Sequence, residues 1–464
     1  MTPAQQDFTP FFLRQQQQAL AQRSTSYAER VALLNRLEKA LEKYRGSIYA
    51  ALMTDLHKSE TESDLTELLP VFKEIHFVKK HLRDWMSPFR VPTPAALTGS
   101  ASYYRYEPKG VCLIISPWNY PFNLTLGPLV AALAAGNTAM IKPSERSPAC
   151  TAVISELIAD TFDPGLAAVF PGDGSVGSAL LDLPFDHIYF TGSAATGKKI
   201  LEKAARHLSP ATLELGGKSP TIIDDTADLK LAARRIAWSK MINYGQTCIA
   251  PDYLLVHTRV KDELMERLKT EVDAFYRQED PAVCRLIDEA HHKKMEGFLE
   301  GLPPQVQRLP LTSHSVSGQV MPQLIVDPPP EAAIMQEEIF GPLLPLLSFE
   351  SLQEAIAFVQ ARPKPLSLYL YSGNRKNIRQ VMEQTSSGGV VVNMGLLHFI
   401  NPNLPFGGIH ASGMGKGHGF FGFQAFSHAK SVLTQDLPLG AAELFSPPYS
   451  KWKQRLLKFV IKYV

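Results

Sequence analysis

Apolar residues in the first part of the chain recur at helical spacing. Tyr27, Val31 and Leu34 follow one another at steps of three and four residues among charged positions, and this is the period of one face of an α-helix. The pattern predicts helices over residues 15–85. The run of glutamines at 15–18 is predicted to be a solvated helix start.

Beyond residue 110, short apolar runs alternate with helical patterns, which is typical of a parallel sheet whose strands are connected by helices. Ser147 is expected as an N-cap with Pro148 at the first helical position. Strands are predicted at 111–116, 138–141, 166–170, 187–190, 221–223, 253–257 and 366–371, and helices at 124–135, 148–161, 229–242, 261–275 and 352–361. The pattern therefore predicts an α/β protein, with a doubly wound sheet in its first half.

The stretch from Gly110 to Ile141 has no charged residue and is long enough to cross a bilayer on length alone. Pro117, Pro121 and Asn123 interrupt it. We therefore expect strand, loop, helix and strand here, and no transmembrane helix. Tyrosines at 103, 104 and 106 in the segment just before it predict a strand, either in a sheet arm or at a sheet edge.

Composition limits the classes of protein. A chain of 464 residues is too long for one ordinary core, so two or three domains are expected. The net charge of +2 is too balanced to indicate a nucleic-acid partner. The cysteines at 112, 150, 248 and 284 are far apart and form no C-x-x-C pair, which argues against a disulfide framework or a zinc site and for a reducing compartment.

The stretch from Asn243 to Tyr253 holds the first candidate for chemistry, Cys248, among small or uncharged neighbours. Gly245 would let the backbone approach a bound molecule closely, and Pro251 would stop a regular helix. A lone cysteine is more often a small core residue than a nucleophile. The assignment therefore depends on partners elsewhere in the chain.

Two glycine-rich turns compete as phosphate-binding loops. Gly172-Asp-Gly-Ser-Val-Gly177 satisfies G-x-G-x-x-G between a strand and a helix, but no acidic residue follows at the expected distance. Phe190-Thr-Gly-Ser-Ala-Ala-Thr-Gly197 also joins a strand to a helix, whose free N–H groups could hold a pyrophosphate. The pattern alone does not choose between them.

Three polar residues at strand ends are candidate partners. Glu214 lies between two leucines, a setting that would move its pKa toward neutrality and make it a usable base. Asn119, between prolines, offers two N–H donors suited to an oxyanion. Lys142 could donate to ribose hydroxyls. For each residue alone, a solvated or turn position is the commoner explanation.

In their order and spacing these stretches resemble the aldehyde dehydrogenase superfamily from about Tyr44 to Lys430. The wording Cys248-Ile-Ala-Pro-Asp-Tyr253 and the short N-terminus are similar to the class 3 branch, which includes fatty, aromatic and coniferyl-type aldehyde dehydrogenases. The stretches that carry the resemblance are Pro117-Trp-Asn-Tyr-Pro121, Lys142-Pro-Ser-Glu145, Phe190-Thr-Gly-Ser193, Leu213-Glu-Leu-Gly-Gly217, Gly245-Gln-Thr-Cys248, Glu337-Glu-Ile-Phe-Gly-Pro342, Pro405-Phe-Gly-Gly408 and Ser412-Gly-Met-Gly415.

The resemblance implies NAD(P)-dependent oxidation of an aldehyde, medium- or long-chain aliphatic or aromatic, to the carboxylic acid. Cys248 would form a thiohemiacetal and then a thioester, Asn119 would help to hold the oxyanion, and Glu214 would activate the hydrolytic water. The cofactor contacts it implies are Lys142, Glu145, Thr191, Gly192, Ser193, Gly197, Leu215, Glu338 and Phe340. No metal site is implied.

The resemblance also places the pyrophosphate by Thr191–Gly197 and not by the loop at Gly172. Glu145 would lie by the adenosine ribose, where its charge would repel a 2′-phosphate. NAD is therefore the expected cofactor, and NADP stays open. The implied fold is a Rossmann-like cofactor domain, an α/β catalytic domain and a small β arm that bridges subunits. The expected boundaries are 1–88 with 108–213 for the cofactor domain, 214–420 for the catalytic domain, 89–107 with 421–440 for the arm and 441–464 for a tail.

Two departures from the family pattern affect the expected substrate and not the reaction. Ile409-His-Ala411 stands where many relatives have a glycine, and Gly417-His418-Gly419 replaces a more usual aromatic-His-Gly. Both are expected near the C-terminal part of the substrate funnel.

The C-terminal segment 451–464 is basic and amphipathic. Trp452, Leu456 and Phe459 share one helical face, and lysines share another. Either weak contact with a membrane surface or docking on the protein itself would fit. The chain is otherwise expected to be a cytoplasmic homodimer, peripheral at the inner membrane face if the tail binds lipid.

Two alternative functions stay open beside aldehyde oxidation. One is a non-redox thiol esterase or acyl transferase that uses Cys248. The other is a catalytically idle binding protein on the same fold. The cofactor set of Lys142, Glu145 and Glu338 speaks against the first, and the intact set of Cys248 and Glu214 with Asn119 speaks against the second.

Overall fold

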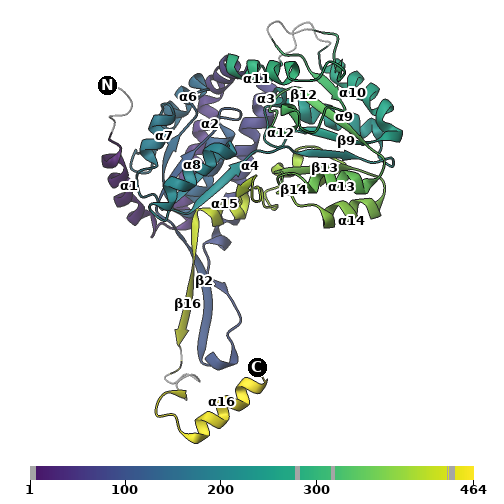
Figure 1. The fold of residues 1–464 in the computed structure, drawn as a ribbon. Coiled ribbons are helices and arrows are strands. Elements are labelled where there is room, and N and C mark those ends of the chain that lie inside the picture. Colours follow the sequence, from purple (N-terminus) through teal and green to yellow (C-terminus); the bar gives the residue numbers. More distant parts are fainter. Residues whose placement is uncertain (1–6, 277–282, 315–318, 436, 438–444, 464) are drawn as a thin grey trace.

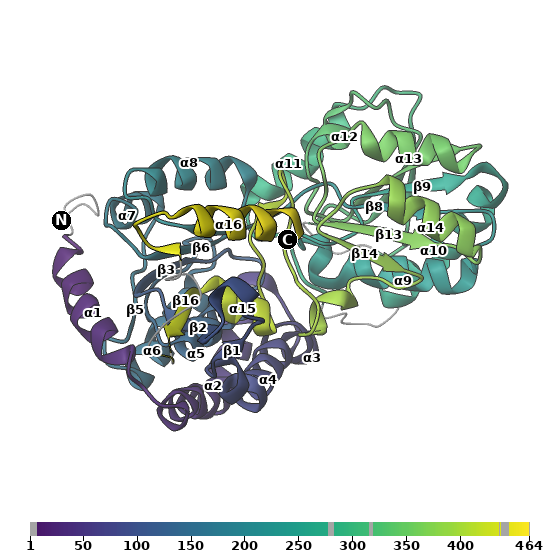
Figure 2. The same cartoon turned by 90° about the horizontal axis from the view of Figure 1, so that it is seen from below.

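The computed structural model describes residues 7–276, 283–314, 319–435, 437 and 445–463. Within these ranges the strands form three sheets, two of them in separate α/β lobes and the third in a narrow arm (Figure 1). Seen along the arm, the two lobes lie side by side (Figure 2). The α/β class with a Rossmann-like lobe, predicted from the alternation of strands and helices, is confirmed.

The first lobe is built on a six-stranded sheet. Its order is β15 (Gly413–Met414), β7 (Ala211–Leu215), β6 (His187–Gly192), β3 (Val111–Ile115), β4 (Thr138–Lys142) and β5 (Ala167–Val169). The strands from β3 to β7 are parallel, and β15 joins β7 antiparallel. The connecting helices are α5 (Asn123–Ala135), α6 (Pro148–Thr161), α7 (Gly174–Leu180) and α8 (Ala194–Ala205).

The stretch from Gly110 to Ile141 therefore holds β3, α5 and β4, as expected. Among the described residues, no helix is long and apolar enough to cross a membrane. β15 lies in the first lobe's sheet although its residues fall in the range 214–420, which we expected in the catalytic domain. A short strand late in the chain carries no periodicity that could have shown this.

Helices of the N-terminal segment cover the first sheet and continue to the arm. They are α1 (Thr9–Gln22), α2 (Tyr27–Leu56), α3 (Glu60–Ser63), a π-helical turn (Asp64–Leu68) and α4 (Leu69–Trp85). The prediction that the glutamine run is a solvated helix start was wrong, because α1 begins at Thr9 and Gln15 is not solvated. This side chain is fully buried and donates to the carbonyls of Ala139 and Pro164 at 3.0 and 3.1 Å.

The start of α6 also differs from the expectation. Ser147 precedes the helix, but its hydroxyl makes no capping hydrogen bond. The carboxylate of Asp55 accepts instead from the backbone N–H groups of Ala149 and Cys150, at 3.3 and 2.8 Å. The cap is thus supplied by α2, from nearly a hundred residues away.

The second lobe is built on a seven-stranded sheet. Its order is β10 (Gln307–Pro310), β11 (Gln323–Val326), β12 (Leu343–Phe349), β9 (Tyr253–His257), β8 (Pro220–Ile223), β13 (Ser367–Tyr371) and β14 (Gly389–Val392). β10 is antiparallel to β11, and the other neighbours are parallel. Its helices are α9 (Leu229–Met241), α10 (Lys261–Phe275), α11 (Glu289–Glu300), α12 (Ala333–Gln336), α13 (Leu352–Gln360) and α14 (Arg375–Gln384).

The arm consists of β1 (Phe89–Arg90), β2 (Ser100–Pro108) and β16 (Ser427–Gln435). β2 and β16 are antiparallel over nine residue pairs, from Ser427 opposite Pro108 to Gln435 opposite Ser100. The short helix α15 (Gly419–Ala425) leads into β16 and packs on α5 and α4. Beyond the arm, α16 (Lys451–Tyr463) lies apart from both lobes (Figure 1).

Candidate active site

The loop before Cys248 has an unusual backbone. Asn243, Tyr244 and Gly245 all have positive φ, at 50°, 56° and 76°. A Cβ at Gly245 would lie 2.3 Å from the carbonyl oxygen of Gly341. Gly245 therefore permits close approach to another part of the protein, where we had expected approach to a bound molecule. Left-handed conformations at non-glycine residues cost free energy, and they are often found at functional sites.

Asn119 and the cysteine loop are joined by hydrogen bonds. The side-chain amide of Asn119 donates to the carbonyl of Gln246 at 3.0 Å, and the amide of Asn243 donates to the carbonyl of Asn119 at 2.9 Å. One residue on, the hydroxyls of Tyr120 and Thr247 are 2.5 Å apart. Two sequence stretches nearly 130 residues apart thus form one buried unit.

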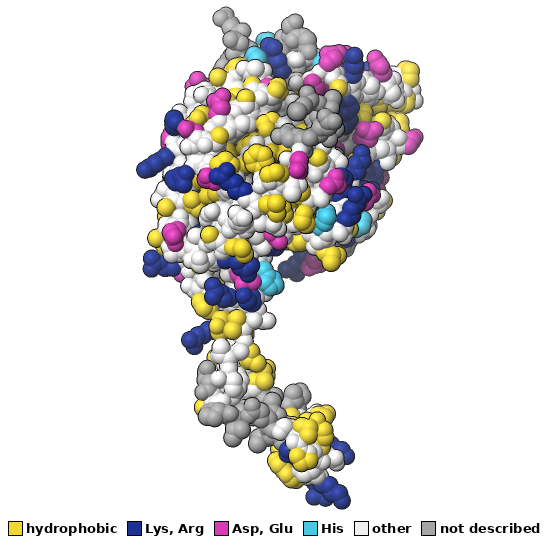
Figure 3. All heavy atoms as spheres, turned by 90° about the vertical axis from the view of Figure 1, so that its left-hand side faces the viewer, with side chains coloured by type: hydrophobic (Ala, Val, Ile, Leu, Met, Phe, Trp, Pro, Cys, Tyr) yellow, Lys and Arg dark blue, Asp and Glu magenta, His cyan; other side chains and the backbone are white. Residues whose placement is uncertain are grey.

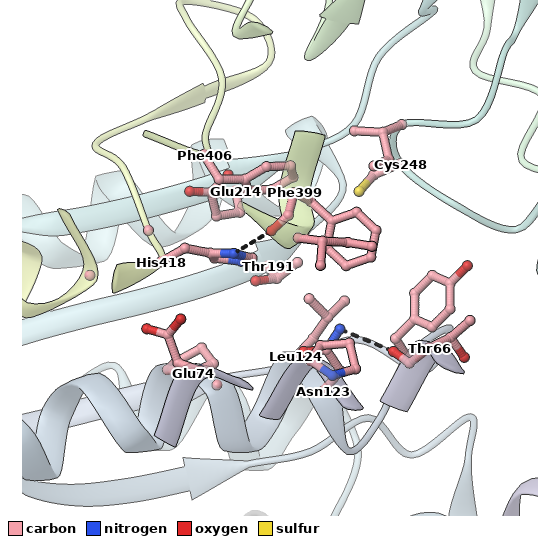
Figure 4. Close-up of a pocket in the computed structure, with 18 of the residues that line it drawn as sticks. Thr66, Glu74, Asn123, Leu124, Thr191, Glu214, Cys248, Phe399, Phe406 and His418 are labelled. Carbon is pink, nitrogen blue, oxygen red and sulfur yellow. Dashed lines mark hydrogen bonds between the residues drawn. The ribbon is translucent and has the colours of Figure 1, made fainter. Parts of the chain in front are cut away.

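Cys248 lines a mainly apolar cavity, and Glu214 lines the same cavity (Figure 4). Residues of both lobes contribute to its walls, and Leu124, Trp238 and Phe399 are examples. The sequence predicted that a cysteine, a carboxylate and an amide would meet. The cavity brings the first two together, and the hydrogen bonds of Asn119 join the third to the cysteine loop.

Glu214 is held at the end of β7, opposite Gly413 of β15. Its side chain is buried, and among the described residues neither carboxylate oxygen has a hydrogen-bond partner. Burial raises the pKa of Glu214 well above its ordinary value, and the ammonium of Lys416 lowers it only partly. A carboxyl group in this setting takes up a proton readily, which is the property required of a base.

The charged form of Cys248, the thiolate, is also disfavoured. Burial raises its pKa to about 12, and the nearby carboxylates of Glu338 and Glu214 add to the effect. A thiolate is the nucleophilic form. The buried surroundings of Cys248 therefore work against its nucleophilic form.

The lysine expected at the cofactor ribose is not solvent-facing. Lys142 is buried at the end of β4, and its ammonium lies 2.6 Å from the carboxylate of Glu145. Beyond β6, which includes Thr191 and Gly192, the hydroxyl of Ser193 caps α8 by accepting from a backbone N–H.

The two glycine loops differ in the helices that follow them. A Cβ at Gly197 would lie 2.9 Å from the side chain of Leu215, so this glycine lets α8 approach β7 closely. α8 has twelve residues. The competing loop at Gly172 leads into α7, which has only seven residues and is capped by Asp173.

Glu338 has the features of a ribose-binding group. One of its oxygens is buried without a hydrogen-bond partner among the described residues, and a Cβ at Gly216 would lie 2.3 Å from the carboxylate. Burial and the neighbouring Asp252 raise its pKa to about 7. An unsatisfied buried acceptor is costly unless a ligand donates to it. This buried acceptor therefore fits a dinucleotide, whose ribose hydroxyls could donate to it.

Phe340 follows in the same loop with a φ of 57°. Its carbonyl is 2.7 Å from Nε2 of His291, and its ring makes an edge contact with Trp118, at 5.4 Å between centroids. His291 and Trp118 support this loop, a role that the sequence did not predict for either residue. Trp118 stands in the stretch Pro117-Trp-Asn-Tyr-Pro121, but that stretch does not reveal its contact with Phe340, because the contacts join three distant segments.

The two departures from the family pattern lie in different places. Gly417 and His418 line the cavity, as expected. Ile409 and His410 are exposed and are not among the residues that line this cavity, so the placement of Ile409-His-Ala411 near the substrate funnel stays a prediction.

Comparison with known proteins agrees with this geometry. A family profile described as the aldehyde dehydrogenase family matches residues 13–432. The chain belongs to the aldehyde dehydrogenase family, whose members oxidise aldehydes with NAD(P). It lies in the class 3-like branch. Nothing in the comparisons supports the non-redox or catalytically idle alternatives.

Individual relatives are similar over nearly their whole length. One is the 4,4'-diaponeurosporen-aldehyde dehydrogenase of Staphylococcus aureus, 43% identical over 92% of this chain and 94% of the relative. Another is aldehyde dehydrogenase family 3 member A2 of Mus musculus, 40% identical over 97% and 93%. A solved substrate-bound structure of Staphylococcus aureus AldH superposes with a TM-score of 0.93 at 40% identity, covering 98% of this chain and all of that one.

Proposed function

We propose that Cys248, Asn119 and Glu214 carry out the aldehyde oxidation of this enzyme on apolar aldehydes. The observation that carries the proposal is the shared cavity, which holds the thiol and the buried carboxyl group between mainly apolar walls. Such walls favour medium- or long-chain aliphatic and aromatic aldehydes, because burial of apolar surface contributes about 25 cal/mol per Å².

The proposed reaction has two stages. The Cys248 thiol gives its proton to water, and the thiolate sulfur bonds to the aldehyde carbon as the π bond of the C=O group breaks. A side-chain N–H of Asn119 stabilises the resulting oxyanion. NAD held by the cofactor residues would supply the hydride acceptor, and loss of the hydride would leave the substrate bound to Cys248 as a thioester. Glu214 then takes a proton from a water molecule as its oxygen attacks the thioester, and the acid and the Cys248 thiolate are released.

We propose that the cofactor lies along Lys142, Glu145, Thr191–Gly197, Leu215 and Glu338, with Phe340 near the nicotinamide. Contacts with the two riboses are supported by the buried ammonium of Lys142 and by an oxygen of Glu338 that has no hydrogen-bond partner in the described part of the chain. The boundaries 1–88 with 108–213, 214–420 and 89–107 with 421–440 stay a proposal for domains that would function as cofactor, catalytic and bridging units. NAD is the expected cofactor, with NADP open.

An assay of NADH formation at 340 nm with a panel of aldehydes tests the substrate class. The panel holds acetaldehyde, hexanal, decanal, benzaldehyde and cinnamaldehyde. We expect kcat/KM to rise from acetaldehyde to decanal. Equal or falling kcat/KM along the aliphatic series would remove the apolar-substrate proposal.

We also propose that the arm joins two copies of the chain. β16 is an exposed edge of the arm sheet, with its backbone N–H and C=O groups available on the side away from β2. Edge strands readily pair with another chain. A cytoplasmic homodimer is the expected state, and light scattering should give twice the chain mass of 51.3 kDa. The mass of one chain would contradict it.

The tail helix α16 is proposed to contact anionic membrane lipid. Its apolar side chains include Trp452 and Phe459, which are 55% and 62% exposed. Its charged residues are all basic, and Figure 3 shows blue side chains at the margins of the yellow face. A basic helix with an exposed apolar face matches an anionic bilayer surface in both charge and polarity.

Flotation with vesicles of phosphatidylcholine and phosphatidylglycerol tests this contact. We expect the full chain to float at low salt, to lose binding as salt rises, and to stay unbound with phosphatidylcholine alone. Deletion of residues 451–464 should abolish flotation. Flotation that the deletion leaves unchanged would contradict the proposal, as would docking of α16 on the protein shown by protection from hydrogen exchange without lipid.

A further inference from the structure

The tripeptide Gly417-His418-Gly419 lies close to two carboxyl groups, those of Glu214 and Glu74. Its first residue, Gly417, departs from the family pattern. A Cβ at Gly417 would lie 2.5 Å from the hydroxyl oxygen of Tyr189 and 3.7 Å from Oε1 of Glu214. Two residues on, the backbone N–H of Gly419 donates to Oε1 of Glu74 at 2.7 Å. The absence of a side chain at Gly417 therefore leaves space beside both Tyr189 and Glu214.

Glu74 lines the same cavity as Cys248, and none of the reaction steps above uses it. It lies on α4, and Figure 4 shows its carboxylate pointing into the cavity, with His418 and Glu214 beyond it. Tyr189 lines the cavity as well. The titratable groups Glu74, Tyr189, Glu214 and His418 thus gather on one side of a cavity that is otherwise mainly apolar.

The electrostatics join these groups. Burial raises the pKa of Tyr189, and the charges of Glu214 and Glu74 raise it further, so its hydroxyl lies in the field of both carboxylates. Burial raises the pKa of Glu74 to about 7, while the N–H of Gly419 opposes the shift. A carboxyl group with this pKa can both accept and release a proton near neutral pH.

The other groups around Glu74 do not compete for the proton. Burial lowers the pKa of His418, and its Nδ1–H donates to the carbonyl of Phe399 at 3.1 Å, so this ring nitrogen is already engaged. Lys73 is exposed beside Glu74 on α4. The ammonium of Lys416 is held by the carbonyls of Gly407 and Gly408. The wall that α5 contributes near Glu74, at Gly127, Pro128 and Ala131, is uncharged.

An apolar substrate chain is a poor occupant for this side of the cavity. It would remove water from Glu74 and Glu214 without supplying a hydrogen bond, which is unfavourable for a carboxylate. The side around Cys248 that includes Trp238, Ile242 and Ile249 suits such a chain better.

We propose that Glu74 receives, through water and the hydroxyl of Tyr189, the proton that Glu214 takes up during thioester hydrolysis. In this step the O–H bond of the Glu214 carboxyl group breaks and an O–H bond to a water molecule or to Tyr189 forms. That group passes its own proton to a carboxylate oxygen of Glu74, which releases it to bulk water. Glu214 returns to the carboxylate form for the next turnover, and no charge accumulates. The proposal rests on the role of Glu214 proposed above.

Stopped-flow kinetics with two readouts tests the path. Absorbance at 340 nm follows the first turnover of NADH, and a pH-indicator dye in weak buffer follows proton release. We expect Glu74→Gln to keep the NADH burst, because a glutamine oxygen can still accept from Gly419. The proton release that follows the burst should slow by roughly tenfold, within the range of proton-transfer effects. Small buffers such as imidazole should restore it.

Further variants separate proton transfer from a structural role. Glu74→Asp should keep most of the proton-release rate, and Tyr189→Phe should slow it while the burst stays intact. Glu300→Gln, an exposed glutamate at the end of α11, is the matched control and should change neither readout. Unchanged proton release in Glu74→Gln, or a burst lost together with it, would overturn the proposal. Absence of any NADH formation by the unmodified enzyme would instead contradict the proposed function itself.

Discussion

Asn119 and Gln246 are joined by a hydrogen bond of 3.0 Å from the side-chain amide of Asn119 to the carbonyl of Gln246. Gln246 precedes Cys248 by two residues. One N–H of Asn119 thus fixes the cysteine loop, and the second N–H of the same amide is the candidate donor to the oxyanion. The side chain that we propose for transition-state stabilisation therefore also positions the nucleophile.

Replacement of this amide should slow the first stage of the reaction. We expect Asn119→Ala to lower the amplitude or rate of the NADH burst, and to reduce kcat by about 10²–10³, which is the usual effect of removing one oxyanion donor. Stopped-flow absorbance at 340 nm measures it. Asn401→Ala, at an exposed asparagine, is the control. A normal burst in Asn119→Ala would show that the amide is not the oxyanion donor.

Glu214 should act only in the second stage. We expect Glu214→Gln to form one equivalent of NADH rapidly and then to turn over about 10²–10⁴ times more slowly, because the hydrolytic water lacks its base. Cys248→Ala should show neither burst nor turnover. A Glu214→Gln enzyme with an unimpaired steady-state rate would mean that another group activates the water.

These residues were found in the sequence because each lies in a local motif. Cys248, Glu214 and Asn119 stand among glycines and prolines, which the local backbone requires and which form recognisable sequence motifs. Glu74 has no such mark, because it is one more glutamate on an amphipathic helix. Its proposed role depends on a hydrogen bond from the N–H of Gly419, which lies 345 residues further along the chain.

The wrong predictions for Gln15 and Ser147 have the same origin. Gln15 is buried because its amide meets the carbonyl of Ala139, 124 residues away. Ser147 does not cap the helix, because the carboxylate of Asp55 accepts from the N–H groups that Ser147 would have capped. Periodicity describes one element at a time, and these contacts form only when elements distant in sequence pack together.

Glu145 should influence the choice between the two cofactors. Its carboxylate is 2.6 Å from the ammonium of Lys142, so it would repel a 2′-phosphate placed beside it and is itself paired with that cation. We expect Glu145→Gln to raise the ratio of kcat/KM with NADP to that with NAD by roughly tenfold, which corresponds to about 1.4 kcal/mol. Glu156→Gln, exposed on α6, is the matched control. An unchanged ratio would remove Glu145 from cofactor selection.

The reactivity of Cys248 should depend steeply on pH when no cofactor is bound. Burial holds its pKa at about 12, above the ordinary value of 9.0, so the thiolate fraction grows with pH throughout the neutral and mildly alkaline range. We expect inactivation by iodoacetamide to accelerate by about tenfold per pH unit from pH 7 to 9, because only the thiolate reacts. A rate that levels off before pH 9 would indicate an ordinary or lowered pKa. Cys248→Ala should incorporate no label over the same range.

The buried ion pair of Lys58 and Glu67 should contribute strongly to the stability of the segment where α5 begins. Both side chains are fully buried and their charged atoms are 2.9 Å apart. The second oxygen of Glu67 accepts from the N–H groups of Phe122 and Asn123, where α5 begins. Lys58→Met would leave an uncompensated carboxylate in the interior.

We expect Lys58→Met to lower the free energy of unfolding by about 3–5 kcal/mol, as for other buried pairs broken on one side. The double variant with Glu67→Leu removes the orphan charge but leaves two buried N–H groups without acceptors, so it should recover only part of the loss. Denaturant unfolding of the two variants and the parent protein measures the difference. A Lys58→Met protein as stable as the parent would contradict the prediction. Full recovery in the double variant would show that Glu67 contributes nothing through the start of α5.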